Sequence, residues 1–143
     1  MTPAERFATP VQGYSHTVPV RVVSAGLVVL LIVWGGRALM SESADLGWQV
    51  LVLLAAALAM VLWQGWYMLF GRTIIDAQGI RQEGVGDKRI SWEEISRLRL
   101  VRLPLSARLL VAGQRGPVKA FHAGTPELIA AFAEIETRYA NHG

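Results

Sequence analysis

The side chains that most often carry chemistry are few and scattered in this chain. Its three histidines, His16, His122 and His142, have no partner at the spacing of a metal-binding motif. Cysteine is absent, which excludes disulfides, thiolate metal ligands and cysteine nucleophiles. We therefore expect solvated histidines and no metal site.

The carboxylates do not form a catalytic pair either. Glu93 and Glu94 are adjacent, so they point to opposite sides of an extended chain, and Glu134 and Glu136 diverge on a helix. The sequence GVGDK, residues 84–88, shares only its glycines with a phosphate-binding loop of the Walker type. We expect no catalytic residue, no cofactor and no enzymatic activity.

Positive charge is the chemical feature that remains. Residues 95–126 carry six basic side chains and no acidic one, although the net charge of the chain is only +3. Near an anionic membrane, each Lys or Arg contributes about 1 kcal/mol of binding. The alternative is a solvated outer face on which some arginines pair with glutamates. The candidate contacts for lipid headgroups or a protein partner are Arg72, Arg97, Arg99, Arg102, Arg108, Arg115 and Lys119.

The charge is not accompanied by a signature of nucleic-acid binding. The sequence has no zinc-finger, helix-turn-helix or RNA-binding motif. We therefore expect no nucleic-acid partner.

The composition divides the chain just before Arg72. Hydrophobic residues make up 52% and charged residues 17% of the whole, against roughly 25% charged residues in soluble proteins. Only Arg37, Glu42 and Asp45 are charged between Arg21 and Arg72. The first part therefore predicts membrane-spanning helices, and the second part predicts one small domain.

Two apolar segments, residues 18–40 and 46–70, predict a transmembrane hairpin. The second is 25 residues long without a charge, enough to cross a bilayer with some tilt. The first has 15 uncharged residues between Arg21 and Arg37, or about 22 Å of helix, so these arginines must reach opposite interfaces with their long side chains. A cleaved signal sequence is the alternative for this segment, and the long polar stretch before it disfavours that reading.

Flanking residues predict how the hairpin is oriented. Basic residues precede the first segment and follow the second, whereas the turn between them carries two acidic residues. The positive-inside rule then places both termini in the cytoplasm. Small residues in both segments would allow close packing, within the hairpin or against another subunit. The predicted interface anchors are Arg21, Arg37, Trp48, Trp63, Trp66 and Tyr67.

The remaining segments predict a tail and a small α+β domain. Residues 1–17 are polar, contain two prolines and show no apolar period, which predicts a mobile or loosely docked tail on the membrane surface. Residues 72–143 change to an alternating pattern that predicts six antiparallel strands. These strands begin at Thr73, Ile80, Lys88, Ile95, Ala107 and Pro117.

A C-terminal amphipathic helix is expected to cover the sheet. Thr125 is a good N-cap, Pro126 fits the first helical position, and Glu127 favours the positive end of the helix. Apolar residues then follow at spacings of four, three and four, which places them on one face. They are Leu128, Phe132, Ile135 and Tyr139.

This order of elements resembles the bacterial pleckstrin-homology-like (bacterial PH) domains that follow a two-helix membrane hairpin. The likeness is carried by TIIDAQGI (73–80), ISWEEISRLRL (90–100), a strand pair and a helix led by Thr-Pro-Glu. It implies a bent antiparallel sheet of six to seven strands capped by a helix, in a multi-pass protein of the bacterial inner membrane. Eukaryotic PH domains that bind phosphoinositides have basic residues in the first hairpin, whereas DAQG has none, so specific inositide recognition is not expected.

Together these features predict a non-catalytic scaffold or adaptor of the inner membrane. Its cytoplasmic domain would dock protein partners or anionic lipid headgroups. The alternative is a small accessory subunit of a larger membrane complex, such as a respiratory or transport complex, bound through the hairpin. The expected partners are membrane lipids together with other membrane subunits or further copies of this chain.

Overall fold

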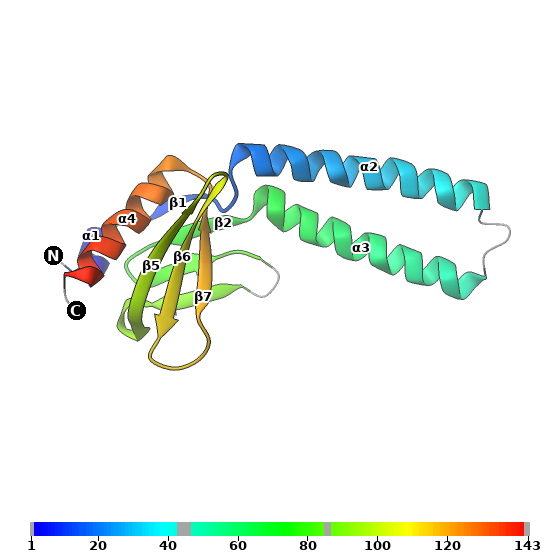
Figure 1. Ribbon diagram of the computed structural model, residues 1–143. Helices are drawn as coiled ribbons and strands as arrows, with labels where there is room; N and C mark the ends of the chain where they lie inside the picture. The colour runs from blue at the N-terminus through cyan, green and yellow to red at the C-terminus, as the bar shows by residue number, and fades with distance from the viewer. Residues whose placement is uncertain (1, 43–46, 85–86, 142–143) are drawn as a thin grey trace.

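Two long helices lie side by side and project from a domain rich in β-strands (Figure 1). The computed structural model describes residues 2–42, 47–84 and 87–141. Helix α2 (Val18–Glu42) and helix α3 (Trp48–Phe70) are long and apolar enough to cross a membrane. Their positions match the predicted segments to within two residues. Of the predicted turn 41–45, Ser41 and Glu42 belong to α2, and residues 43–45 lie outside the described residues.

The two helices contact each other through small residues. Gly65 is buried on α3, and a side chain there would collide with Val28 of α2. Ser24 is also buried, and its hydroxyl lies 3.2 Å from the sulfur of Met68. Small residues thus bring the helices together, as expected for a hairpin.

The N-terminal segment is part of the folded domain, so the prediction of a loose tail over residues 1–17 was wrong. It contains the short helix α1 (Pro3–Arg6) and strand β1 (Val11–Tyr14). Between them, the Phe7 ring is fully buried and stacks on Trp92 at 5.6 Å between ring centroids. One buried ring and a four-residue strand produce no visible apolar period, because the partners of both lie far away in the sequence.

Strand β1 is the edge of a four-stranded antiparallel sheet with the order β1-β2-β3-β4. It pairs with strand β2 (Arg72–Ile75), so that Val11 lies opposite Ile75 and Tyr14 opposite Arg72. The domain is therefore discontinuous in sequence, because both apolar helices are inserted between its first two strands. The other strands of this sheet are β3 (Gly79–Gln82) and β4 (Lys88–Ser91).

A second antiparallel sheet has three strands in the order β5-β6-β7. A short 3-10 helix, η1 (Trp92–Glu94), leads into it from β4. Its strands are β5 (Ile95–Leu103), β6 (Ser106–Gly113) and β7 (Lys119–Ala123). All six strands predicted after Arg72 are therefore confirmed, and the seventh precedes the helices.

Local chemistry explains the first turn between strands. The Asp76 carboxylate accepts hydrogen bonds from the N–H groups of Gln78 and Gly79 at 2.9 and 3.1 Å. Gly79 has a positive φ of 152°, and a side chain there would collide with the Ile90 carbonyl. This position therefore requires glycine.

Helix α4 (Pro126–Ala140) covers the open side between the two sheets (Figure 1). Its predicted start is confirmed, because the Thr125 hydroxyl accepts a hydrogen bond from the Leu128 N–H at 3.4 Å. The Glu136 carboxylate accepts one from the Leu100 N–H of edge strand β5 at 2.8 Å. The apolar face of α4 completes a core that includes Ile75, Ile80, Ile90, Leu109, Val111, Phe121, Leu128, Phe132 and Ile135, all buried.

Candidate functional site

The register of the three-stranded sheet decides which predicted basic residues share a surface. Leu109 and Val111 of β6 are buried, so the residues between and beside them point outward. Arg99 lies opposite Leu110, and Arg97 lies opposite Ala112. The outer face of this sheet therefore carries Arg97, Arg99 and Arg108, with His122 opposite Arg108 on β7.

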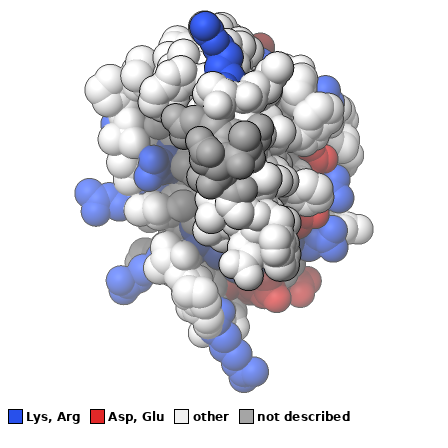
Figure 2. Space-filling view, turned by 90° about the vertical axis from the view of Figure 1, so that its right-hand side faces the viewer, with Lys and Arg blue, Asp and Glu red and all other residues white. Residues whose placement is uncertain are grey.

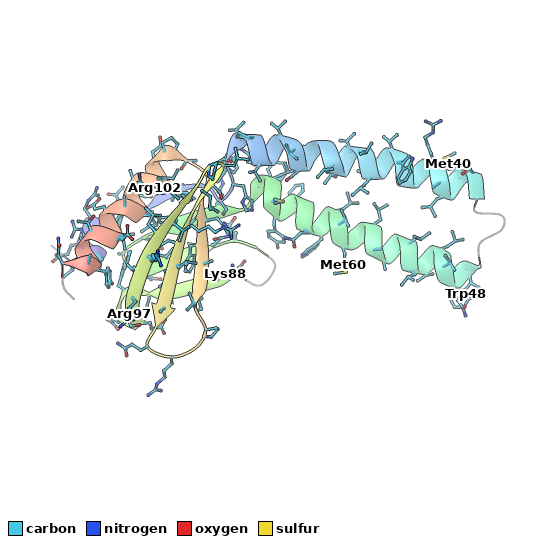
Figure 3. All side chains as sticks on the ribbon, in the orientation of Figure 1. Met40, Trp48, Met60, Lys88, Arg97 and Arg102 are labelled. Carbon is cyan, nitrogen blue, oxygen red and sulfur yellow. The ribbon has the colours of Figure 1, made fainter. Side chains whose placement is uncertain are left out.

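The other predicted basic residues lie elsewhere. Arg102 lies opposite the buried Ala107, hence on the other face, and Figure 3 labels Arg97 and Arg102 toward opposite ends of β5. Arg115 is exposed in the turn after β6, and Arg72 belongs to the other sheet. Lys119 donates a hydrogen bond to the Arg89 carbonyl at 2.7 Å and so joins the two sheets. The seven residues do not form one continuous stripe.

A view along the helices leads to the same conclusion. Figure 2 shows blue Lys and Arg side chains on several sides of the outline, with red acidic side chains along its right side and at the lower right. This face of the molecule thus has basic residues at its rim and no single basic patch.

Arg21 holds the junction between the helices and the sheet. Its Nε donates a hydrogen bond to the Leu69 carbonyl at 2.7 Å, in the last turn of α3, where carbonyls lack helical partners. Its guanidinium also stacks on the Tyr14 ring at 3.7 Å, and Arg72 approaches the same ring at 5.5 Å. Arg21 therefore ties the start of α2 to the end of α3 and to β1.

The other predicted interface anchors line the surface of the helices. Trp48, Trp63 and Trp66 are 61% to 70% exposed, and Arg37 is exposed toward the far end of α2. The Tyr67 ring is half-buried at the domain end of α3 and contacts Trp63 at 5.8 Å between centroids.

The chain passes from sheet to helices without a flexible link. The Ser15 N–H bonds to the Gly71 carbonyl at 3.0 Å, and the Gly124 N–H bonds to the Tyr14 carbonyl at 2.9 Å. The Thr73 hydroxyl is buried between Ser15 and β7, where it donates to the His122 carbonyl at 2.6 Å. These bonds fix the base of both helices to both sheets.

A polar cavity of about 380 Å³ lies at this junction. The rings of His16 and His122 meet there, 5.3 Å apart between centroids. Two cations, Lys88 and Arg108, and one carboxylate, Glu83, also line it. We call this the junction cavity, and its remaining lining residues are Ser15, Gln64, Tyr67, Met68, Gln82 and Gly84.

Burial and, to a lesser extent, positive surroundings lower the pKa of both imidazoles. Burial, followed by the nearby His16, Arg108 and Lys88, lowers the pKa of His122 to about 4. Burial, followed by the charge of Arg108, also lowers the pKa of His16. Within residues 2–42, 47–84 and 87–141, no three His, Asp or Glu side chains gather in the manner of a metal site.

The sequence reasoning missed this cavity. Arg108 was among the candidate contacts for lipid or a partner, and His16 and His122 were expected to be solvated, whereas both rings are half-buried and contact each other. These rings come together only because β1 pairs with β2 and β7 contacts both strands. No local signal in the sequence could have indicated the contact.

An apolar rim borders the junction on the α2 side. The β5–β6 turn presents Leu103 and Leu105, which are 42% and 59% exposed. The Thr17 hydroxyl donates a hydrogen bond to the Leu105 carbonyl at 2.6 Å, which fixes the turn beside the start of α2. Val18, the first residue of α2, is 65% exposed, so the apolar surface of the helix continues onto the domain.

Comparisons with known proteins found no matching family model, no matching curated protein and no matching solved structure.

Proposed function

We propose that this protein is a non-catalytic membrane scaffold. In this proposal α2 and α3 cross a bilayer and hold the β domain against one face, where it docks protein partners or anionic lipid headgroups. The observation that carries the proposal is the exposure of the helices, since only 6% of the 18-residue apolar stretch in each helix is buried. So much exposed apolar surface is costly in water and is stable in lipid.

The junction supports a fixed position for the domain. The Ser15 hydrogen bond to Gly71 and the stacking of Arg21 on Tyr14 join the helix bases to the first sheet, and the Gly124 hydrogen bond joins β1 to the end of β7. The exposed leucines of the β5–β6 turn would then enter the membrane interface beside α2. A domain held in this way presents the same surface to the lipid at all times, as a scaffold requires.

The location and family remain parts of the proposal. The charge pattern favours an orientation with both termini in the cytoplasm, and the resemblance to bacterial PH-like proteins implies a bacterial inner membrane. Two antiparallel sheets of four and three strands with a C-terminal helix support the proposed likeness to a bacterial PH-like domain, although here the first strand precedes the two helices.

Cysteine labelling tests the membrane placement, because the natural chain has no cysteine. Ser41→Cys places one thiol near the end of α2, and Gln78→Cys places one in the β2–β3 turn; both positions are exposed. With an impermeant maleimide, we expect Ser41→Cys to react in intact spheroplasts and Gln78→Cys to react only after lysis. Labelling of Gln78→Cys in intact cells, or release of the protein by alkaline carbonate alone, would contradict the proposal.

An accessory subunit is the second candidate, and a groove between the helices favours it. The groove encloses about 290 Å³ and is lined by apolar residues, including the small residues Gly35, Ala38 and Ala57. Small residues allow close approach of another helix, so the occupant in this case is an apolar helix of a larger complex. Purification in mild detergent should then recover a stoichiometric partner that Ala57→Leu releases and the exposed Leu53→Ala retains. Recovery of this chain alone would contradict the second candidate.

A further inference from the structure

We propose that the junction cavity binds a phosphate group, carried either by an anionic lipid headgroup or by a soluble phosphate. Two cations from different strands, Lys88 and Arg108, line one cavity together with the His16 and His122 rings. This combination of positive charge and N–H donors suits phosphate oxygens.

The donors in the cavity are available. In the described part of the chain, the Arg108 guanidinium forms no hydrogen bond or ion pair, and the Lys88 ammonium donates only to the Ala120 carbonyl at 3.2 Å. The imidazoles of His16 and His122 contact each other, but their nitrogens have no hydrogen-bond partner there. Among the described residues, neither ring has a nitrogen that is both buried and unpartnered, so the unpartnered nitrogens are accessible from outside.

The charge balance of the cavity favours an anion. Its charged groups are Lys88 on β4, Arg108 on β6 and Glu83 after β3, and its other titratable groups are the two imidazoles and the Tyr67 phenol on α3. With neutral imidazoles the balance is one positive charge. A phosphate would supply the missing negative charge and would raise the pKa of both imidazoles, which their present surroundings lower.

The size and position of the cavity favour a lipid headgroup over free phosphate. Its volume of about 380 Å³ falls in the usual range of about 300 to 1,000 Å³ for organic ligands. Gln64, Tyr67 and Met68 of α3 form its wall on the helix side, and Figure 3 labels Lys88 on the side of the domain nearest the helices. This lipid source rests on the proposed membrane placement, whereas the phosphate chemistry does not.

Histidine NMR of the full chain in non-ionic detergent and phosphate-free buffer tests the proposal. The probes are dihexanoyl phosphatidylglycerol and inorganic phosphate, with dihexanoyl phosphatidylcholine as the control for acyl-chain binding. We expect phosphatidylglycerol to shift the His16 and His122 resonances and to raise the pKa of both rings by about one unit or more.

Two matched variants connect the shifts to the cavity. Arg108→Gln removes a cavity cation, and Arg97→Gln removes the same charge from the same outer face outside the cavity. Loss of a charge-assisted contact should weaken phosphatidylglycerol binding about tenfold or more in Arg108→Gln, and Arg97→Gln should bind like the natural chain. Arg108 is exposed, so unchanged thermal unfolding is expected for both variants.

The arms of the experiment separate the two phosphate sources. Binding of phosphatidylglycerol much tighter than inorganic phosphate supports a headgroup site, and equal binding supports a soluble phosphate. Absence of histidine shifts with both probes, equal binding of both lipids, or equal weakening by Arg97→Gln would overturn the proposal. If neither probe binds but the cysteines label as expected, the phosphate site is wrong and the scaffold function stands. If a probe binds but the cysteine labelling contradicts the membrane placement, only the lipid source of the phosphate is wrong.

Discussion

Phe7 joins the N-terminal segment to the core of the domain. Its ring is fully buried and stacks on Trp92. We expect Phe7→Ala to lower the free energy of unfolding by about 3 to 5 kcal/mol, because the lost ring leaves a cavity that the sheets cannot close. Chemical unfolding of the full chain in detergent, followed by circular dichroism, measures the change. Gln12→Ala on the exposed side of β1 is the control, and an equally small effect of both substitutions would contradict the role of Phe7.

His122 makes stability depend on pH. Its pKa is about 4 in the folded protein and about 6.5 when unfolded, so the unfolded chain binds a proton more readily. The contribution of His122 to the free energy of unfolding is therefore fully present above pH 6.5 and is lost as the pH drops toward 4. One pKa unit corresponds to about 1.4 kcal/mol, and partial exposure screens the effect, so we expect a loss of about 1 to 2 kcal/mol.

The substitution His122→Gln should remove this pH-dependent part of the free energy of unfolding. Unfolding free energies measured between pH 7 and pH 4 in phosphate-free buffer should fall less for the variant than for the natural chain. Two parallel curves would show that His122 does not titrate in this way.

At the level of elements, the two sheets meet where the residue after β7, Gly124, contacts the end of β1. We call this contact the seam. The Gly124 N–H bonds to the Tyr14 carbonyl, and a side chain on Gly124 would collide with the His16 carbonyl. We expect Gly124→Ala to destabilise the fold by about 1 to 3 kcal/mol, because backbone must move to admit the methyl group.

Gly84→Ala is the matched control for this substitution, since no described atom lies within 4 Å of the added methyl group. Thermal unfolding of both variants should separate them clearly. If both unfold at the same temperature, the seam is not as tight as the structure indicates.

The elements differ in how far the sequence could predict them. Helices α2 and α3 follow from long uncharged runs, and α4 follows from its N-cap and apolar spacing, which are all local features. Strand β1 could not be found, since it has four residues and its partner β2 follows 58 positions later at the closest pair, Tyr14 and Arg72.

The whole molecule is a domain with two helices inserted between neighbouring strands. We expect residues 72–143 alone to remain unfolded, because they lack β1 and the Phe7 ring. A chain that joins Thr17 to Gly71 through a short Gly-Ser linker should fold without the helices, since the Ser15 N–H already bonds to the Gly71 carbonyl.

Amide dispersion in NMR spectra distinguishes these two chains. The spliced chain should give dispersed resonances and the truncated chain collapsed ones. Equal dispersion in both would show that the N-terminal segment is not needed for the fold, contrary to its buried position.

The sequence by itself determined the apolar helices, the six strands after Arg72 and the capped helix α4, because each depends on composition or spacing over a few neighbouring residues. Only the tertiary structure decided that residues 2–17 belong to the domain, that the basic residues divide among several surfaces and that His16 meets His122 beside Arg108. These outcomes depend on strand pairing between distant segments. Such pairing is selected by the packing of the whole core, and a local pattern does not encode it.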